Sequence, residues 1–462
     1  MLDPMHSVLL GIRRTQEEFR FYRTFEGFEG GNLHKKTRLA VYLCPMRAEI
    51  ITIGTEILLG QTVDSNSAWM GQRLSEVGVE VQRITSISDQ PLAIVAALDA
   101  VLPSTQWVLI TGGLGPTKDD LTKHVLTDYF GDSLAYRPEI YEHIEALFAK
   151  MGRVPNALNR PQADFPRKAE LLHNAMGTAQ GMLWKEHGRR YVSMPGVPYE
   201  MKHILETGVL PRMRAEQADV HLHRYFVVQG VPESDLALRI ESWESTLPAG
   251  LSLAYLPSPG VVKLRLSARV AAVDQPVMEA NMEREATTLK ALLGADCYAE
   301  DLVPLEVVVG EKLKQAGQTV ATAESCTGGS IVARLTSIPG SSAYVVGGVV
   351  AYSNSVKEHH LGVRKADLMV HGAVSEPVVR QMAEGVRKRL KSDWALATSG
   401  VAGPDGGSEA KPVGTVWIAL AGPNGTWSKK FSMGLNRSRT VEKSVLAALD
   451  ALRRALDGRE AK

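Results

Sequence analysis

The stretch Trp107-Val108-Leu109-Ile110-Thr111-Gly112-Gly113 decides the fold of the first part of this 462-residue chain. Its apolar and β-branched run predicts a strand buried on both faces, and the glycine pair ends it. Upstream, 49–53 and 79–87 form further strand-like runs, separated by predicted helices at 64–77 and 89–102. This alternation predicts a parallel sheet covered by helices.

The remainder of the chain divides into a small middle region and a second α/β region. We predict the middle strands and helices at 225–228, 233–243, 251–255, 261–267 and 277–293. For the last region we predict helices ending at 317, 335, 390 and 456, with strands at 319–323, 344–352, 394–399 and 415–420. The predicted fold class is α/β, with two three-layer α/β domains joined by a small α+β module. The predicted boundaries are 1–45, 46–215, 221–299 and 303–456, the first being a disordered or mis-annotated extension with no sustained period.

The composition restricts the kind of partner and the compartment. The 52 Lys and Arg nearly balance the 51 Asp and Glu, so no basic excess indicates nucleic acid as the main partner. Three widely separated cysteines, Cys44, Cys297 and Cys326, are typical of reduced thiols and exclude a cysteine-rich zinc site. With no apolar run of about 18–20 residues and no secretion signal, we expect a soluble, cytoplasmic protein that does not bind membranes.

In the first domain a glycine-rich turn follows the strand that ends at Thr111. Gly112 and Gly113 allow backbone N–H groups to approach a ligand, and we expect a helix to begin near Asp119, where its N-terminus favours anions. Asp119 and Asp120 beside a phosphate site suit a bridging divalent cation. The alternative is a plain turn with Asp as a helix cap. Gly54-Thr55-Glu56, at the end of another strand, favours the functional interpretation.

The last region carries a second candidate anion site, Glu324-Ser325-Cys326-Thr327-Gly328-Gly329. It follows a predicted strand and precedes a predicted helix, so its N–H groups can face a phosphate while Ser325 or Thr327 caps the helix. Cys326 is a weak candidate for a nucleophile because no His partner is evident and buried thiols are common.

A possible serine nucleophile and its base occur in the next segments. A serine such as Ser342 needs a neighbouring base before it becomes reactive. Lys357 can accept a proton if its pocket is partly desolvated, and Tyr352 can relay the proton. From spacing alone a solvated surface lysine is the commoner case. Ser399 opens a glycine-rich loop between two strands that we expect to wrap a ligand.

These motifs together resemble the CinA (competence/damage-inducible protein A) family, whose C-terminal domain matches about 303–456. The resemblance implies hydrolysis of nicotinamide mononucleotide to nicotinate mononucleotide and ammonia, with no cofactor. It implies that Ser342 is the nucleophile and that Tyr352 and Lys357 activate it. The implied substrate contacts are Ser325, Thr327, Gly328, Gly329, Ser399 and Arg437.

Residues 46–215 resemble the molybdopterin-binding fold, supported by Asn174-Ala175-Met176-Gly177-Thr178-Ala179 and by 194–201. This resemblance implies a metal-dependent ADP-ribose pyrophosphatase, with Asp89 and Asp120 as metal positions and an unidentified divalent cation. The other implied site residues are Glu56, Gly112, Gly113 and Asp119.

The middle region resembles the KH-like module of full-length family members, but it lacks an evident GXXG loop, so we do not expect RNA binding. The expected partners are small nucleotides and a second copy in a homodimer. The alternative function is a non-enzymatic partner-binding protein in competence or DNA repair.

Overall fold

A computed structural model describes residues 10–15, 18–23, 46–115, 117, 120–217 and 219–459. The chain forms two compact units, 1–221 with 269–273, and 222–268 with 274–462. Strands β1 (Leu10–Thr15) and β2 (Glu18–Arg23) pair antiparallel. The prediction of no regular structure was therefore wrong for these two segments, and the rest of 1–45 lies outside the described residues. None of the described helices is both long and apolar enough to cross a membrane.

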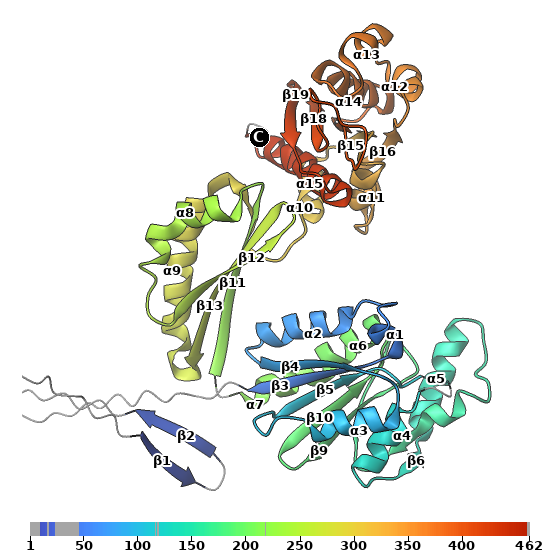
Figure 1. The fold of residues 1–462 in the computed structure, drawn as a ribbon, viewed down its shortest axis with the longest axis vertical. Coiled ribbons are helices and arrows are strands. Elements are labelled where there is room, and N and C mark those ends of the chain that lie inside the picture. Colours follow the sequence, from blue (N-terminus) through green and yellow to red (C-terminus); the bar gives the residue numbers. More distant parts are fainter. Residues whose placement is uncertain are drawn as a thin grey trace, which may run out of the picture. The chain divides into compact units, whose positions relative to one another are not determined.

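The first domain is built on a six-stranded sheet in the order β4-β3-β5-β10-β9-β8 (Figure 1). The four strands from β4 to β10 are parallel, whereas β9 and β8 are antiparallel additions. The strands are β3 (Arg47–Ile53), β4 (Glu80–Ile87), β5 (Trp107–Thr111), β8 (Glu170–Leu172), β9 (Gly181–Glu186) and β10 (Arg189–Met194), with a separate pair β6 (Leu134–Tyr136) and β7 (Asp164–Pro166). The parallel core confirms the α/β prediction.

Helices pack on both faces of this sheet. Two buried clusters form, one with α2, α6 and α7 and the other with α3, α4 and α5. The helices are α1 (Thr55–Leu58), α2 (Ser65–Glu76), α3 (Pro91–Asp99), α4 (Thr122–Tyr129), α5 (Pro138–Lys150), η1 (Arg160–Ala163), α6 (Pro198–Ile204), η2 (Leu205–Val209) and α7 (Leu210–Glu216). Asp64 caps α2 by accepting from Ser67 N at 2.9 Å, as predicted. The helix expected near Asp119 begins at Thr122, and Asp119 itself lies outside the described residues.

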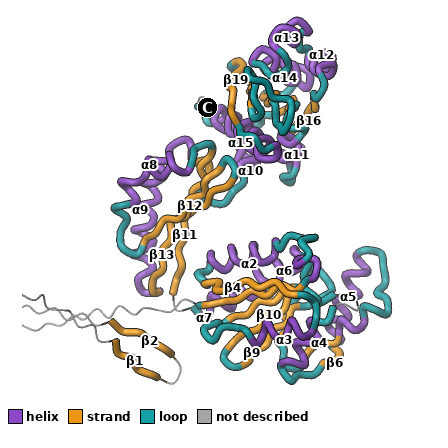
Figure 2. Tube along the Cα trace, viewed as in Figure 1, coloured by secondary structure: helices purple, strands orange, loops and turns teal. Residues whose placement is uncertain are grey.

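The middle module is a four-stranded sheet in the order β12-β13-β11-β14. Its elements are β11 (Asp219–Gln229), α8 (Glu233–Glu244), β12 (Leu251–Ser258), β13 (Val261–Ala271), η3 (Ala272–Asp274), α9 (Gln275–Leu293), η4 (Gly294–Asp296) and β14 (Cys297–Ala299). Helices α8 and α9 share one core with β11 and β13 (Figure 2). The predicted elements are present, and β11 extends well upstream of its predicted start.

The last domain has a five-stranded sheet in the order β16-β15-β17-β18-β19. Its strands are β15 (Val320–Glu324), β16 (Val345–Val350), β17 (Trp394–Gly400), β18 (Thr415–Gly422) and β19 (Gly425–Ser432). The first three in sheet order are parallel, and β18 and β19 form an antiparallel hairpin. We did not predict β19, because its polar residues do not form an apolar run.

Helices cover both faces of this second sheet. One cluster involves α10, α11 and α15, and the other involves α12, α13 and α14. The helices are α10 (Leu305–Ala316), α11 (Ser330–Thr336), η5 (Ser341–Ala343), α12 (Asn354–Leu361), α13 (Lys365–His371), α14 (Glu376–Leu390) and α15 (Arg437–Leu456). Because β15, β16 and β17 are parallel, the loops at their carboxyl ends meet at one edge, where α/β sheets bind ligands.

A buried ionic network connects the middle module to this last domain. Asp296 accepts from Arg454 at 2.8 Å, and Arg454 also pairs with Asp450 at 2.7 Å. These side chains are less than one-tenth exposed, and each aspartate has a second arginine partner, Arg239 for Asp296 and Arg453 for Asp450, so the buried charges compensate one another. The module therefore has a structural connection to the last domain.

Candidate active site

The turn after β15 is shaped by a buried carboxylate. Glu324 is fully buried and accepts hydrogen bonds from the backbone N–H groups of Gly329 (3.0 Å), Ile331 (3.0 Å) and Val332 (2.9 Å). These groups belong to the first turn of α11, whose N–H groups have no partner within the helix. Glu324 therefore fixes the turn at 325–329 from the inside. We did not single out this residue from the sequence, although an acid that ends an apolar strand just before Ser-x-Thr-Gly-Gly is the signal for it.

Thr327 helps to hold the same turn. Its hydroxyl lies 2.8 Å from Glu324 Oε2 and 2.7 Å from Thr398 Oγ1, and its side chain is buried. The Thr327 side chain thus supports the turn, and the N–H groups of Gly328 and Gly329 are also bonded within it, to Ser325 O at 3.2 Å and to Glu324 at 3.0 Å. Gly328 and Gly329 both have positive φ, 62° and 97°, which a side chain would strain.

Lys357 is a deeply buried lysine next to this turn. It is 1% exposed, on helix α12, which Ser353 caps by accepting from Val356 N at 3.3 Å. Its Nζ lies 3.2 Å from Ser325 Oγ, 2.7 Å from Ala351 O and 3.2 Å from Tyr352 O. Burial lowers the pKa of Lys357 from its ordinary value of 10.5, because desolvation disfavours the charged form. The predicted partly desolvated lysine is therefore present.

The three contacts of Lys357 suit both of its protonation states. A charged ammonium has three N–H donors, one for each of the three oxygens. A neutral amine has two donors, which the carbonyls of Ala351 and Tyr352 can accept, and a lone pair that can accept the Ser325 hydroxyl proton. The geometry therefore allows Lys357 to take a proton from Ser325 and to return it without moving its two carbonyl partners.

The structure does not bring Ser342 to Lys357 within one chain. Ser342 is exposed in η5, just before β16 begins, whereas Tyr352 and Lys357 follow the end of that strand. A six-residue strand at about 3.3 Å per residue separates the two ends by roughly 20 Å. The predicted intrachain triad of Ser342, Tyr352 and Lys357 is therefore not formed, and the hydroxyl beside Lys357 is that of Ser325.

Other predicted site residues have defined positions. The Tyr352 side chain is 66% exposed, so it is open to a ligand, while its carbonyl holds Lys357. Cys326 is buried, and burial raises the pKa of its thiol to about 11, which disfavours the thiolate needed by a nucleophile. Ser399 is also buried and donates to Ala373 O at 2.8 Å, so its hydroxyl is used within the fold.

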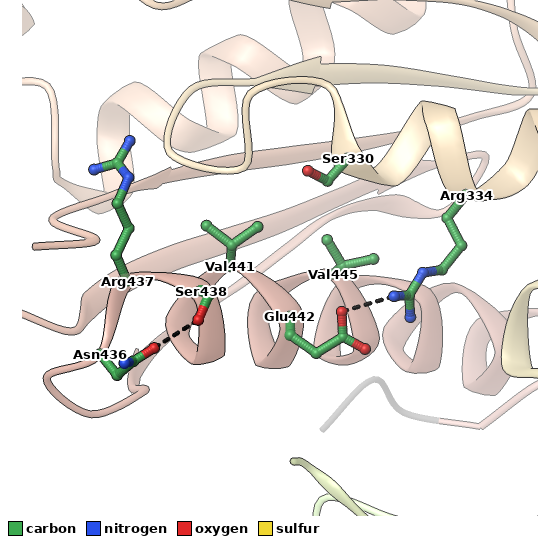
Figure 3. A pocket seen from close by; sticks show the side chains of 8 residues that line it. All are labelled: Ser330, Arg334, Asn436, Arg437, Ser438, Val441, Glu442 and Val445. Carbon is green, nitrogen blue, oxygen red and sulfur yellow. Dashed lines mark hydrogen bonds and ion pairs between the residues drawn. The ribbon is translucent and has the colours of Figure 1, made fainter. Parts of the chain in front are cut away.

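Arg437 lines an open cavity of about 650 Å³ between α11 and the start of α15 (Figure 3). The cavity lining is Ser330, Arg334, Asn436, Arg437, Ser438, Val441, Glu442 and Val445. Arg437 donates to Gly403 O at 2.9 Å, which ties it to the glycine-rich loop after β17, and Arg334 is neutralised by Glu442 at 2.7 Å. An exposed arginine beside the helix that follows the Ser325 turn is suited to an anionic group.

In the first domain the glycine turn is constrained by its neighbours. Gly112 has φ 117°, and a Cβ on it would lie 2.1 Å from Ile53 O. Gly113 has φ 65°, and a Cβ there would lie 2.1 Å from Thr122 Oγ1. Only glycine fits both positions, because a side chain would collide with Ile53 or Thr122 of the same domain.

The two predicted metal positions lie on loops at the carboxyl edge of this sheet. Asp89 Oδ2 accepts from Thr55 N at 2.9 Å, and Asp120 Oδ2 accepts from Thr117 N at 2.9 Å. Among the residues that the structure describes, no group of three or more His, Cys, Asp or Glu side chains is placed to hold a metal ion. The two carboxylates fit a cation of the magnesium type only if phosphate oxygens or waters complete its coordination.

A smaller cavity of about 120 Å³ lies near these loops and includes Glu56, Asp64, Asn66 and Thr111 in its lining. Asn66 donates to Gly196 O at 2.8 Å, while its Oδ1 is buried with no hydrogen-bond partner in the described part of the chain. Our reading of the sequence missed Asn66, because it lies inside a helix and outside any glycine motif.

Comparisons with known proteins agree with this division into domains. Residues 303–456 match the family described as "CinA C-terminal domain", and residues 49–215 match the one described as "Probable molybdopterin binding domain". A CinA-like protein from Cytophaga hutchinsonii is 42% identical over 410 residues, covering 88% of this chain and 98% of the relative. The chain belongs to the CinA family.

Other CinA-family proteins are similar to most of the chain or to one part of it. A CinA-like protein from Prochlorococcus marinus is 42% identical over 414 residues, covering 88% of this chain and 95% of its own length. A solved structure of competence/damage inducible protein CihA from Agrobacterium tumefaciens is 40% identical, with a TM-score of 0.33, and covers 34% of this chain and 99% of that one.

Proposed function

We propose that the last domain hydrolyses the carboxamide of nicotinamide mononucleotide to nicotinate mononucleotide and ammonia, with Ser325 as nucleophile and Lys357 as its base. The observation that carries this proposal is the 3.2 Å contact between Ser325 Oγ and the buried Nζ of Lys357. Serine needs an adjacent base to become nucleophilic, and a desolvated lysine can serve as one. The choice of substrate follows from the resemblance to the CinA family.

The reaction has two balanced steps. Lys357 takes the hydroxyl proton as Ser325 Oγ bonds to the carboxamide carbon, and the C–N bond then breaks as the proton passes to the leaving nitrogen, releasing ammonia. Water then adds to the acyl carbon, with Lys357 accepting its proton, and returns Ser325 to its free form. The backbone N–H groups of Cys326 and Thr327 are the candidates for stabilising the oxyanion, because those of Ser325, Gly328 and Gly329 donate to oxygens of the fold.

Substitution of Ser325 tests this assignment. Ser325→Ala should lower kcat for ammonia release by several orders of magnitude, because no hydroxyl would then remain beside Lys357. Ser337→Ala is the matched control: Ser337 follows α11, its hydroxyl caps Arg334 O at 2.7 Å, and it should retain normal activity. Near-normal ammonia release by a folded Ser325→Ala protein would overturn the assignment.

We also propose a metal-dependent ADP-ribose pyrophosphatase in the first domain. It is supported by two carboxylates, Asp89 and Asp120, that threonine donors hold on loops beside the glycine turn. A divalent cation bound there would neutralise phosphate charge, while Gly112 and Gly113 allow the pyrophosphate to approach the backbone. Asp120→Asn should abolish ADP-ribose cleavage and leave ammonia release unchanged. Equal loss of both activities would contradict two separate sites.

A further inference from the structure

The small cavity beside the glycine turn of the first domain has a hydrogen-bond acceptor in its lining that the fold does not use. It is Asn66 Oδ1, which is buried and has no hydrogen-bond partner among the residues that the structure describes. A buried acceptor without a donor destabilises a fold, so native structures rarely keep one unless a ligand or a water satisfies it. Asn66 Oδ1 therefore indicates a ligand group that donates a hydrogen bond at this position.

The orientation of the Asn66 amide is fixed by its nitrogen. Asn66 Nδ2 donates to Gly196 O at 2.8 Å and lies 3.5 Å from Thr111 Oγ1. The Thr111 hydroxyl donates its own proton to Pro195 O at 2.8 Å, so it is free to accept from Asn66. A flipped amide would set Oδ1 against the Gly196 carbonyl, where two acceptors repel each other. The nitrogen thus belongs to the fold, and Oδ1 is the atom that remains for a ligand.

The lining of this cavity matches a neutral group with several hydroxyls. Glu56, Thr62 and Asp64 contribute further oxygens, and the described residues that line the cavity include no lysine, arginine or histidine. Two carboxylates with no cationic side chain beside them repel a phosphate. Adenine offers one amino group as a donor to these oxygens, whereas ribose offers several O–H groups. The chemistry of the lining therefore favours a sugar over a phosphate or a base.

The cavity also lies where a sugar attached to a phosphate is expected. Thr111 and Gly196 belong to its lining, and a Cβ on Gly196 would lie 3.4 Å from Gly112 Cα, so the cavity borders the glycine turn. At roughly 30 Å³ per water molecule, its volume of about 120 Å³ equals that of about four waters. This is room for a single pentose ring but not for a ribose with its base, so the sugar is one that ends the molecule.

We infer that this cavity holds the terminal ribose of ADP-ribose, and that Asn66 selects for this sugar by accepting a hydrogen bond from one of its hydroxyls. The inference rests on the proposed pyrophosphatase function of the first domain, and it adds which end of the substrate lies beside the glycine turn. Asn66 is thus a specificity-determining residue that holds the sugar while the pyrophosphate lies at Gly112 and Gly113. Binding a remote part of the substrate in this way also positions the bond that is cleaved.

A pair of substrates tests the inference. ADP-ribose is compared with the ethyl ester of ADP, which keeps the pyrophosphate bond but lacks the terminal ribose, and AMP release is measured for both. The full-length wild type should prefer ADP-ribose by about 10–100-fold in kcat/KM, because the ester leaves Asn66 Oδ1 without a donor. Asn66→Ala should lower kcat/KM for ADP-ribose about 10-fold, and that for the ester less than about threefold.

Two controls accompany this comparison. Gln72→Ala removes an exposed amide from the same helix, one that donates to Glu76 at 3.2 Å, and it should keep the wild-type preference. An ADP-ribose whose adenosine is replaced by deoxyadenosine is altered only at the other ribose, and it should be cleaved like ADP-ribose by the wild type. Circular dichroism establishes that the variants are folded, and the comparison of substrates on the wild type depends on no variant.

Three outcomes would overturn the inference. Equal cleavage of ADP-ribose and the ester by the wild type would mean that the cavity does not bind the terminal ribose. Equal losses on both substrates in a folded Asn66→Ala protein would mean that the amide only supports the loop at Gly196. A wild-type preference against the deoxyadenosine compound that Asn66→Ala abolishes would assign the cavity to the other ribose. A wild type that cleaves neither ADP-ribose nor the ester would instead refute the proposed pyrophosphatase, and the inference with it.

Discussion

Replacing Lys357 by Met removes the proposed base while keeping an unbranched side chain of similar length. Loss of a general base typically lowers the rate by about 10²–10⁴-fold, and we expect kcat/KM to fall in this range. The fold should also be weakened, because the buried carbonyl of Ala351 loses the donor 2.7 Å away. An unsatisfied buried acceptor costs about 1–3 kcal/mol, partly offset because a buried amine no longer has to be desolvated.

The pH dependence of the wild type gives the same prediction an independent readout. Only neutral Lys357 can accept the Ser325 proton, so kcat/KM should rise with pH and level off above the pKa of Lys357, which burial lowers from 10.5. The unfolded chain protonates this lysine more readily than the folded one does. The free energy of unfolding of the wild type should therefore increase as the pH rises from the lowered pKa of Lys357 to 10.5, and Lys357→Met should not show this increase.

The assay is chromatographic quantification of nicotinate mononucleotide, with urea unfolding for stability. Lys365→Met, on the exposed start of α13, is the matched control and should behave as wild type in both measurements. The reasoning would be refuted by a Lys357→Met protein whose kcat/KM stays within about threefold of wild type with the same alkaline limb.

Three further predictions concern the turn and the first domain. Glu324→Gln should lower the unfolding free energy by about 2–4 kcal/mol in urea titrations, because the carboxylate accepts from three backbone N–H groups. An unchanged unfolding transition would show that Glu324 does not stabilise the turn. Gly112→Ala should lower the unfolding free energy by more than about 1 kcal/mol and impair ADP-ribose cleavage, because its Cβ would lie 2.1 Å from Ile53 O, whereas ammonia release should stay normal. ADP-ribose turnover equal to that of the wild type would argue against a close approach of the ligand to Gly112. A chelator should abolish ADP-ribose cleavage and spare ammonia release, and product analysis showing the reverse would place the metal in the other domain.

The sheets and most helices could be predicted because burial imposes a regular period on their side chains. The run at 107–111 is buried at every position, as expected for a central parallel strand, and Asp64 caps α2 as its residue type indicates. Strand β19 escaped prediction because it is stabilised by pairing with β18 and not by a buried face of its own. Tertiary pairing of this kind leaves little trace in one sequence.

The candidate site was only partly predictable for a similar reason. The buried lysine and the glycine turns were recognised from residue types, but proximity in sequence does not show at which end of a strand a residue lies. Ser342 and Lys357 are 15 residues apart (357 minus 342) with β16 between them, whereas Ser325, 32 residues from Lys357 (357 minus 325), touches it because β15 and β16 end at the same edge. Parallel pairing therefore selects Ser325 over Ser342.

The most direct test of the central claim is to locate the acyl group after a rapid acid quench with nicotinamide mononucleotide. Trypsin separates the two serines, since Ser325 lies in peptide 315–334 and Ser342 in peptide 335–357. We predict that mass spectrometry finds the nicotinate mononucleotide acyl adduct on peptide 315–334 and loses it in Ser325→Ala. An adduct on peptide 335–357 would contradict the assignment of Ser325 as the nucleophile.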